Sequence, residues 1–347
     1  MNKILQLFNE KYVVGLLTEK VLPLYPGFKE VKSVKIRAYK KMIWEHTYHV
    51  VVEFKTIFIN KKNKQTELPI FCSAHSDEPR KNVYDSLKFL WEHGFGKGKL
   101  SIPHPLFYSE YFQGTFYRGV EGRNLYRYIR EDNRKEIESI VSRAAAWFSK
   151  LHNIDVSEAR NFNEENSRIE TVFPGIGHIL WRIGEDYPKY ADAYKEIYEI
   201  LNKREKEFLA STKKSWLVHG DAHPENIIKM SPRKIAVIDF TDLCLSDFAR
   251  DIGAFTQQLE FMINRKINDK EYAQKIKKIF LDNYFKNSKI KPEPGLQARI
   301  DNYYYWTAMR TATYFLIKDG PEPERSYPVI RQVCAGLDIK TNYNDIC

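Results

Sequence analysis

The sequence has few cysteines and no long apolar run. Its 347 residues include only Cys72, Cys244, Cys334 and Cys347, and no two of them form a C-x-x-C pair. This spacing argues against a zinc ribbon and against the dense disulfide framework of small secreted domains. No apolar stretch reaches the length of a transmembrane helix, and the N-terminus lacks the apolar core of a signal peptide. We therefore expect a cytoplasmic protein.

The sequence also lacks internal repeats, heptads and low-complexity tracts, which argues against solenoids, coiled coils and long disordered tails. Hydrophobic residues make up 43% of the chain and charged residues 29%, the balance of an ordinary globular protein. The net charge of +10 predicts affinity for anions such as nucleotides and phosphorylated compounds. The basic residues are scattered, without the basic stripe or known module that nucleic-acid binding needs, so no nucleic-acid or membrane partner is expected.

The most informative stretch carries two aspartates and an asparagine. It begins Trp216-Leu-Val-His-Gly-Asp-Ala-His-Pro-Glu-Asn-Ile-Ile and continues, after a proline-containing turn, with Ile235-Ala-Val-Ile-Asp-Phe. The apolar runs are short and rich in β-formers, as expected for strands that hold loop side chains on a rigid support. The turn would bring Asp221, Asn226 and Asp239 together. Phosphoryl transfer needs one carboxylate to orient a hydroxyl, and an amide with a second carboxylate to hold magnesium.

This spacing resembles the catalytic core of the protein-kinase-like fold. Its His-Gly-Asp form is similar to that of the aminoglycoside phosphotransferase and choline kinase family, whose members phosphorylate small molecules. The resemblance implies that Asp221 is the catalytic base and that Asn226 and Asp239 are magnesium ligands. It also implies that His219 braces the loop and that His223 touches the transferring phosphate. Each residue alone could be an ordinary turn residue, and the argument depends on the features occurring in register.

Two further segments carry the resemblance. Asp247-Phe-Ala-Arg-Asp251 is similar to the Asp-Pro-x-x-Asp segment of the family, with Phe248 where proline is usual. Val120-Glu-Gly-Arg-Asn-Leu125 resembles the hinge segment, which implies that backbone groups near Val120 meet an adenine ring. An ordinary turn explains the second segment equally well.

Periodicity predicts an α+β chain with a β-rich beginning. Three strands over residues 31–77, with no room for crossover helices, predict an antiparallel sheet; an amphipathic helix over 81–93 and two strands at 106–111 and 115–120 follow. Short helices are expected before residue 30, and longer ones at 134–152, within 170–209, and at 252–265, 270–285, 296–318 and 326–336. The order of these elements resembles that of the bilobal protein-kinase-like fold. The resemblance implies that residues 1–118 form a β-rich nucleotide-binding lobe, and that 119–347 form a helical lobe with the catalytic loop and a substrate-binding subdomain.

The predicted first lobe departs from the family in three places. The turn Lys40-Lys-Met-Ile-Trp-Glu-His46 has no glycine, although a glycine-containing loop usually covers the phosphates there. Ser73 occupies the position of the strand lysine that binds the α- and β-phosphates. The following helix offers Asp85 or Ser86 where a glutamate usually pairs with that lysine.

The missing lysine leaves two explanations open. In the first, Lys55, Lys40 or His75 reaches the phosphates from a neighbouring strand and the enzyme is active. In the second, nucleotide handling is altered or lost, and the chain is a catalytically weak binding or scaffolding module. The catalytic base and both magnesium ligands are retained, which favours the active enzyme.

The expected function is therefore ATP- or GTP-dependent phosphoryl transfer, with Mg²⁺, to a hydroxyl of a sugar, metabolite or antibiotic. Basic residues outnumber acidic ones by 15 to 11 over residues 252–347, which favours a neutral or anionic acceptor over a polycation. Aromatic residues at 303–306 could stack on a sugar or a quaternary ammonium, although helical spacing favours a core role. A protein kinase is disfavoured because no long activation segment follows Asp239.

Overall fold

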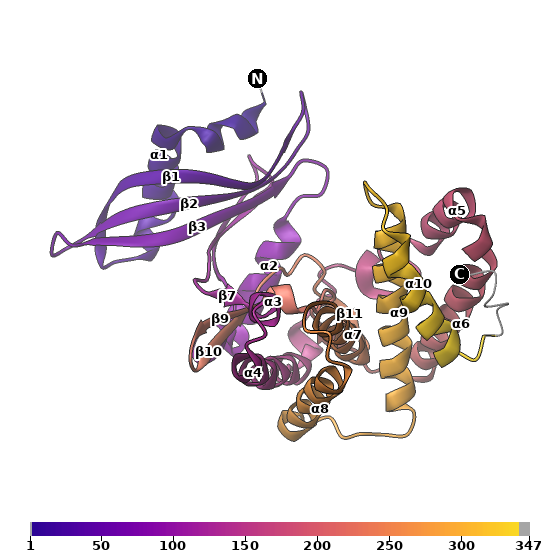
Figure 1. Cartoon of the computed structure of the whole chain (residues 1–347). Coiled ribbons are helices and arrows are strands. Elements are labelled where there is room, and N and C mark those ends of the chain that lie inside the picture. The colour runs from indigo at the N-terminus through magenta and orange to yellow at the C-terminus, as the bar shows by residue number, and fades with distance from the viewer. Residues whose placement is uncertain (1, 340–347) are drawn as a thin grey trace. The chain divides into compact units, whose positions relative to one another are not determined.

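The computed structural model describes residues 2–339 (Figure 1). The chain divides into two compact units, and each is described here by itself. The first contains the chain up to Arg123 together with residues 228–241, and the second contains residues 124–227 together with the chain from Asp242 onward. The predicted functional division at residues 118 and 119 stays a prediction.

The first unit is built on a five-stranded antiparallel sheet. Its strands have the spatial order β1 (Phe28–Ile43), β2 (Tyr48–Asn60), β3 (Gln65–His75), β6 (Gly114–Arg118) and β5 (His104–Ser109). Along β3, the buried residues Ile70, Cys72 and Ala74 alternate with the partly exposed Phe71 and Ser73. Because side chains alternate between the two faces of a strand, the sheet has one apolar face and one mixed face.

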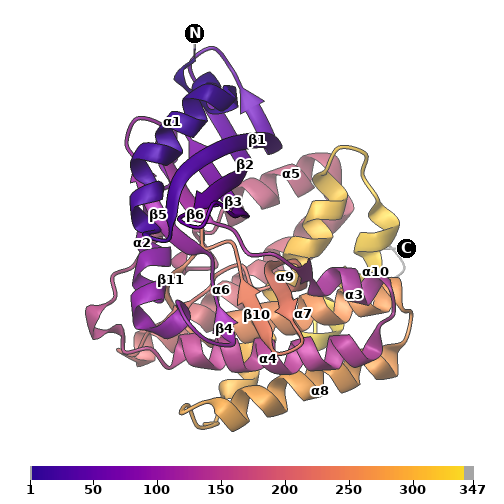
Figure 2. The ribbon, with the colours of Figure 1, turned by 90° about the vertical axis from the view of Figure 1, so that its left-hand side faces the viewer.

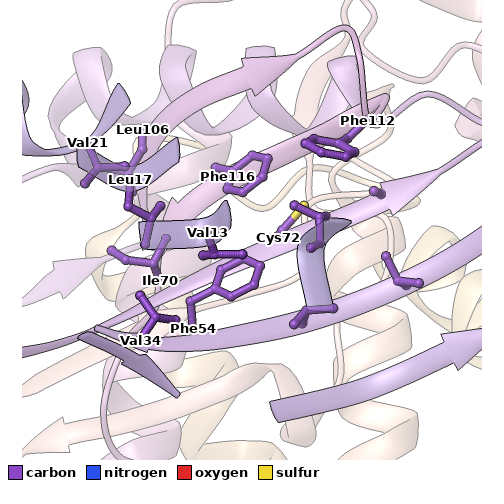
Figure 3. Close-up of a cluster of buried hydrophobic side chains, with 14 of the residues drawn as sticks. Val13, Leu17, Val21, Val34, Phe54, Ile70, Cys72, Leu106, Phe112 and Phe116 are labelled. Carbon is purple, nitrogen blue, oxygen red and sulfur yellow. The ribbon is translucent and has the colours of Figure 1, made fainter. Parts of the chain in front are cut away.

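The apolar face is covered by the N-terminal helices. Helix α1 (Glu10–Lys20) lies between the short helices η1 (Lys3–Phe8) and η2 (Leu22–Leu24). Figure 3 shows its Val13 and Leu17 among Phe54, Ile70 and Cys72 of the sheet, in a cluster of buried side chains. The burial of this apolar surface holds the N-terminal segment on the sheet and leaves the opposite face for other contacts.

The rest of the first unit contains a helix and a small second sheet. Helix α2 (Lys81–Leu90) continues into a turn, η3 (Trp91–Phe95), that ends at Gly94, where φ is 92°. The small sheet has the order β4 (Leu100–Ser101), β10 (Lys234–Val237), β9 (Ile227–Ser231) and β7 (Arg123–Asn124). Gly122 crosses beside this sheet so closely that a Cβ atom there would come within 2.2 Å of the Lys229 carbonyl oxygen.

The second unit is mainly helical. Its α-helices are α3 (Leu125–Arg130), α4 (Arg134–His152), α5 (Ile176–Asp186), α6 (Ala191–Ser211), α7 (Ala249–Lys266), α8 (Lys270–Asn287), α9 (Leu296–Ile317) and α10 (Pro323–Gly336). Short 3₁₀ helices lie at η4 (Val156–Glu158), η5 (Glu165–Ser167), η6 (Pro188–Tyr190) and η7 (Pro224–Asn226). Helix α4 packs along α8, and α7 packs on α9 (Figure 2). Among the described residues 2–339, no helix is both long and apolar enough to span a bilayer.

The predicted protein-kinase-like fold class is confirmed. Helix α4 has the predicted bounds, and α7 to α10 lie close to theirs. Strand β1 begins at Phe28, before the predicted range, and its pairing with β2 continues through the exposed residues Lys40 and Lys41. The structure adds three short strands that the periodicity did not indicate. These are β4, β7 and β11 (Cys244–Ser246), and β11 pairs with β8 (Trp216–Val218).

We expect Leu17→Ala in α1 to destabilise the protein by about 2–5 kcal/mol, because Leu17 is fully buried against the sheet and truncation leaves a cavity. Chemical denaturation would measure this loss. Leu5→Ala is the matched control, since the Leu5 side chain is 37% exposed and its truncation should cost less than about 1 kcal/mol. Equal effects of the two substitutions would contradict the packing described here.

Candidate active site

The loop after β8 is held by one buried carboxylate of the second unit. Asp251, in the first turn of α7, accepts hydrogen bonds from the backbone N–H groups of His219 (2.7 Å) and Gly220 (3.0 Å). The Nε2–H of His152 donates to the same carboxylate at 3.0 Å. Three donors on one buried carboxylate fix the position of the peptide that immediately precedes Asp221.

The Asp251 carboxylate is itself supported from behind. Because a carboxylate only accepts, the His152 proton lies on Nε2, and the hydroxyl of Tyr284 donates to Nδ1 at 2.8 Å. Burial tends to raise the pKa of Asp251, but the hydrogen bond and charge of His152, with help from His219, hold it below its usual range. The carboxylate is therefore ionised throughout the physiological pH range.

The adjacent Arg250 holds the other side of the loop. Its buried guanidinium donates from Nη2 to the Gly220 carbonyl at 3.2 Å and from Nη1 to the Asn166 carbonyl. Gly220 has a φ of 83°, and a Cβ atom there would come within 2.2 Å of the Asp242 carbonyl oxygen. A glycine is thus required at this point of the His-Gly-Asp motif, both by its left-handed backbone conformation and by the space available.

Asp221 projects from this fixed loop into a polar group of side chains. Its side chain is 47% exposed, and its Oδ2 lies 3.3 Å from Nε2 of His223. The Nδ1 atom of His219 accepts a hydrogen bond from the Asp221 N–H at 3.3 Å. Burial opposes ionisation, but the hydrogen bond from His223 and the charges of His223, His219 and Arg310 keep the pKa of Asp221 well below its ordinary value. An exposed, ionised carboxylate of this kind can orient a hydroxyl and accept its proton.

Asn226 is oriented by the same loop. Its Nδ2 donates to the Asp221 carbonyl at 3.0 Å and to Asp221 Oδ2 at 3.4 Å. These bonds orient the amide with Nδ2 toward Asp221 and Oδ1 away from it. Oδ1 accepts no hydrogen bond from the residues that the structure describes. The second unit therefore brings together four of the predicted residues: His219, Asp221, His223 and Asn226.

Asp239 belongs to the first unit. It directly follows the small sheet in a left-handed conformation with φ of 65°, which aspartate tolerates better than most residues. Its Oδ1 accepts hydrogen bonds from the Thr241 hydroxyl (2.9 Å) and N–H (3.4 Å), whereas Oδ2 accepts none from residues 2–339. The negative charge of Asp239 adds to burial in raising the pKa of Tyr117 on β6.

The oxygen donors of Asn226 and Asp239 are of the kind that Mg²⁺ prefers. Within the described part of the chain, no group of three or more His, Cys, Asp or Glu could hold a metal ion alone. Magnesium sites in phosphotransferases often use only one or two protein ligands and complete the shell with phosphate oxygens and water. Asn226 and Asp239 each offer a donor of this kind, and their joint binding of Mg²⁺ stays a prediction.

Ser73 lies on the mixed face of the large sheet, with Val51 and Thr115 beside it in register. Lys55 pairs with Pro69, four residues further along β2, which corresponds to roughly 13 Å. Lys40 and His75 lie nearer, because Lys40 pairs with Val51, the register partner of Ser73, and His75 lies two residues beyond Ser73 on β3. Val120 lies in the partly buried segment after β6, and its contact with a nucleobase stays a prediction.

A further cation near Ser73 was missed in the sequence. The Thr115 hydroxyl donates to the Arg80 carbonyl, and the Arg80 N–H donates to the Gln113 carbonyl at 3.2 Å, which anchors Arg80 beside the strand next to Ser73. The Arg80 side chain is 8% exposed and lies 3.2 Å from Glu78. Burial is the largest cause that lowers the pKa of His49 to about 4, and the charges of Lys40 and Arg80 lower it further. The charge of Arg80 therefore reaches the His49 and His75 pair.

The sequence matches the family model described as "Phosphotransferase enzyme family" over residues 51–275, more than half of the chain. The chain belongs to the phosphotransferase enzyme family. This match includes Ser73, the loop around Asp221, and the Asp251 segment. Membership makes the chain a relative of small-molecule kinases, as the sequence motifs had implied. A search of curated proteins gave no match.

Solved structures show the same fold in other members. The choline kinase LicA from Streptococcus pneumoniae has a TM-score of 0.54 at 14% identity, covering 95% of this chain and 100% of the other. An ethanolamine kinase from Plasmodium vivax has a TM-score of 0.52 at 12% identity, covering 90% and 83%. The spectinomycin phosphotransferase APH(9)-Ia, in complex with ADP and spectinomycin, has a TM-score of 0.52 at 10% identity, covering 97% and 96%. At these identities the likeness establishes the fold.

Some residues around the site carried a usable sequence signal. Asp251 did, since it occupies a family segment, and His152 ends the helix before the catalytic loop. Arg80 and Arg310 carried no such signal, because isolated arginines are common and only their spatial neighbours distinguish them.

The aromatic run at 303–306 is mostly core, as helical spacing favoured: Tyr303, Tyr304 and Trp306 are buried.

We expect Asp251→Asn to destabilise the protein by about 3–5 kcal/mol, because an amide placed between three donors breaks a buried charged network. Thermal and urea unfolding would measure the change, with Asp186→Asn on α5 as a surface control. The folded pKa of Asp251 lies below its ordinary value, so the stabilisation is present at neutral pH and is lost as pH falls below about 4. The two proteins should therefore converge in stability at acidic pH, and a constant difference would contradict this account.

Proposed function

We propose that the protein transfers the γ-phosphate of ATP or GTP to a hydroxyl of a small molecule, with Asp221 as the catalytic base. The observation that carries the proposal is the exposed, ionised Asp221 carboxylate on a loop fixed by Asp251. A fixed carboxylate lowers the entropy cost of orienting the acceptor hydroxyl and can accept the proton of that hydroxyl. His219 supports the loop from inside, and His223 would donate from its ring to a phosphate oxygen or to Asp221.

Asn226 and Asp239 would hold Mg²⁺ together with phosphate oxygens of the nucleotide. The ion would neutralise negative charge on the transferring phosphoryl group. The Nδ2 hydrogen bonds of Asn226 support this role, because they keep the Oδ1 end of the amide turned away from Asp221. The Thr241 contacts of Asp239 similarly leave Oδ2 available.

The nucleotide would lie on the mixed face of the large sheet, with backbone groups near Val120 at the base and the phosphates toward Ser73. We propose that Arg80 supplies much of the positive charge that the absent lysine would otherwise supply, with Lys40 and the His75 ring beside it. Its anchoring at Thr115 next to Ser73 supports this assignment. Lys55 is the weakest of the named cations, given its distance along β2.

A second candidate function is a nucleotide-binding or scaffolding module with weak catalysis. Ser73 is the observation that favours it, because loss of a phosphate-binding lysine can cost several kcal/mol of transition-state stabilisation. The ordered Asp221 loop and the buried Arg80 favour the enzyme. We place the activity in the cytoplasm, with a neutral or anionic acceptor, on the basis of composition and charge.

We expect Asp221→Asn to lower phosphoryl transfer by at least about 10²-fold, because the general base is lost while the loop retains its backbone contacts. ADP release would measure this effect, with Asp186→Asn as the matched control. Normal turnover in Asp221→Asn would refute the assignment of the base.

Asp239→Asn should abolish the magnesium-dependent rise in Tm with ATP, a shift of at least about 2 °C at saturating nucleotide. Thermal unfolding would measure this effect, again with Asp186→Asn as the matched control.

For Arg80→Met, a rise of about 10- to 100-fold in the KM or Kd for MgATP is expected, because a charge-assisted contact to phosphate is lost. Lys88→Met, at an exposed position of the helix α2 that Arg80 precedes, is the control. Arg80→Lys should restore part of the affinity, and unfolding curves would identify any loss of the fold. Unchanged nucleotide binding in a folded Arg80→Met would leave Lys40 and His75 as the phosphate-binding groups.

A further inference from the structure

Helix α9 places a second arginine near the catalytic carboxylate. The guanidinium of Arg310 lies 5.3 Å from the centre of the Trp306 ring, and the buried Arg250 approaches the same ring at 5.2 Å. The Arg310 Nη2 donates to the Phe173 carbonyl at 2.9 Å. Stacking on an indole and one backbone hydrogen bond hold the planar group in place and leave most of its donors available.

Arg310 is linked to the Asp221 loop through Trp306 and Arg250. Arg310 and Arg250 approach the same indole ring, and Arg250 donates to the carbonyl of Gly220, the residue before Asp221. The charge of Arg310 is also among those that lower the pKa of the Asp221 carboxyl. Conversely, burial and the neighbouring Arg250 lower the pKa of Arg310, against the opposing effect of Asp221 and Asp242. The two side chains are therefore within electrostatic reach of each other, inside the second unit.

Arg310 differs from the other arginines around it in its partners. Arg299 forms ion pairs with Asp247 and Glu293, and Arg182 pairs with Asp186. In the chain from residue 2 to 339, no carboxylate lies within ion-pair distance of Arg310. A positioned guanidinium without a carboxylate partner is well suited to bind a carboxylate or phosphate from a ligand.

The charges around Asp221 favour an anionic group at Arg310. His223, His219 and Arg310 are among the groups whose charge acts on Asp221, and all three are positive or protonatable. The Glu205 carboxylate of the same unit is buried and occupied, since it accepts from the Ile169 N–H at 2.9 Å and from the Tyr303 hydroxyl at 2.9 Å. A polycation beside Asp221 would be attracted by Asp221 and Asp242 but repelled by Arg310, whereas an anion would be attracted by Arg310.

We propose that Arg310 binds an anionic group, a carboxylate or a phosphate, on the hydroxyl-bearing acceptor and thereby selects anionic acceptors. This inference rests on the proposed function. The acceptor oxygen forms the new bond to the γ-phosphorus, the bond from that phosphorus to the bridging oxygen breaks, and the nucleoside diphosphate leaves. The hydroxyl proton passes to Asp221, while Arg310 holds the other end of the acceptor.

Matched acceptor pairs test the proposal. We would measure ADP release from MgATP with glycerate against glycerol, gluconate against glucose, and glycerol 3-phosphate against glycerol, and include choline and kanamycin as cations. At least one anionic member should exceed its neutral partner about tenfold or more in kcat/KM. In Arg310→Met that ratio should fall about 10- to 150-fold, mainly through KM, as expected for a lost charged hydrogen bond. Arg310→Lys should restore part of the ratio.

Arg134→Met is the control, because Arg134 stacks on Tyr272 and pairs with Asp132 and Asp269, partners that Arg310 does not share. In Arg134→Met, the ratio of kcat/KM for an anionic acceptor to that for its neutral partner should equal the ratio in the unaltered protein. Calorimetric titration of the same anions into the MgADP complex gives a second measurement that does not need turnover. Absence of any Arg310-dependent preference in both measurements overturns the proposal.

Two other outcomes also overturn it. Asp221-dependent turnover of choline or kanamycin above every anion would show a cationic acceptor and leave the proposed function intact. Equal losses in Arg310→Met for anionic acceptors, neutral acceptors and water would show that Arg310 acts on the transferring phosphate. The proposed function itself fails only if no acceptor gives Asp221-dependent ADP release and magnesium with nucleotide causes no shift in Tm.

Discussion

The candidate active site depends on the contacts of one buried carboxylate. Asp251 accepts hydrogen bonds from two consecutive backbone N–H groups and from His152, and this fixes the peptide that carries Asp221 into solvent. Arg250 binds the carbonyl of the same peptide from the other side. A loop is ordinarily the most mobile part of a fold, but this loop has the rigidity of the helices α4 and α7 that supply its partners. The precision that phosphoryl transfer requires is thus built into the second unit before any ligand binds.

The distribution of charge connects the fold to the proposed chemistry. In the first unit, Arg80 occupies the neighbourhood in which relatives of this fold usually place a strand lysine. In the second unit, Arg310 lies near Asp221, the proposed base, without a carboxylate partner among residues 2–339. The Arg80 side chain is 8% exposed, and the interaction of such a group with anions is less screened than at the surface. A protein that handles a polyphosphate at one site and an anionic acceptor at another would need this arrangement.

Several features could be predicted from local sequence. The alternation of β2 and β3, the amphipathic helices α4 and α7 to α10, and the His-Gly-Asp motif all have periodicities or spacings that depend on neighbouring residues. The roles of Arg80 and Arg310 could not be predicted in this way. Arg80 follows Ser73 by seven residues, and only the return of the chain across Thr115 places it beside that strand. Arg310 and Asp221 lie far apart in the chain, on α9 and on the loop after β8, and the absence of ion pairs to Arg310 within residues 2–339 is a property that no sequence pattern reveals.

The sequence by itself determined the fold class, the family and the identity of the loop residues, because each of these depends on hydrophobic period or on residues close together in the chain. The tertiary structure alone decided which charges surround Asp221, which cation lies near Ser73, and why Gly220 cannot be another residue. Those properties arise from contacts over long sequence separations, where burial and the orientation of each donor set the electrostatics. Asp251 belongs to both categories: its position was visible in a motif, and its three hydrogen bonds were visible only in the folded chain.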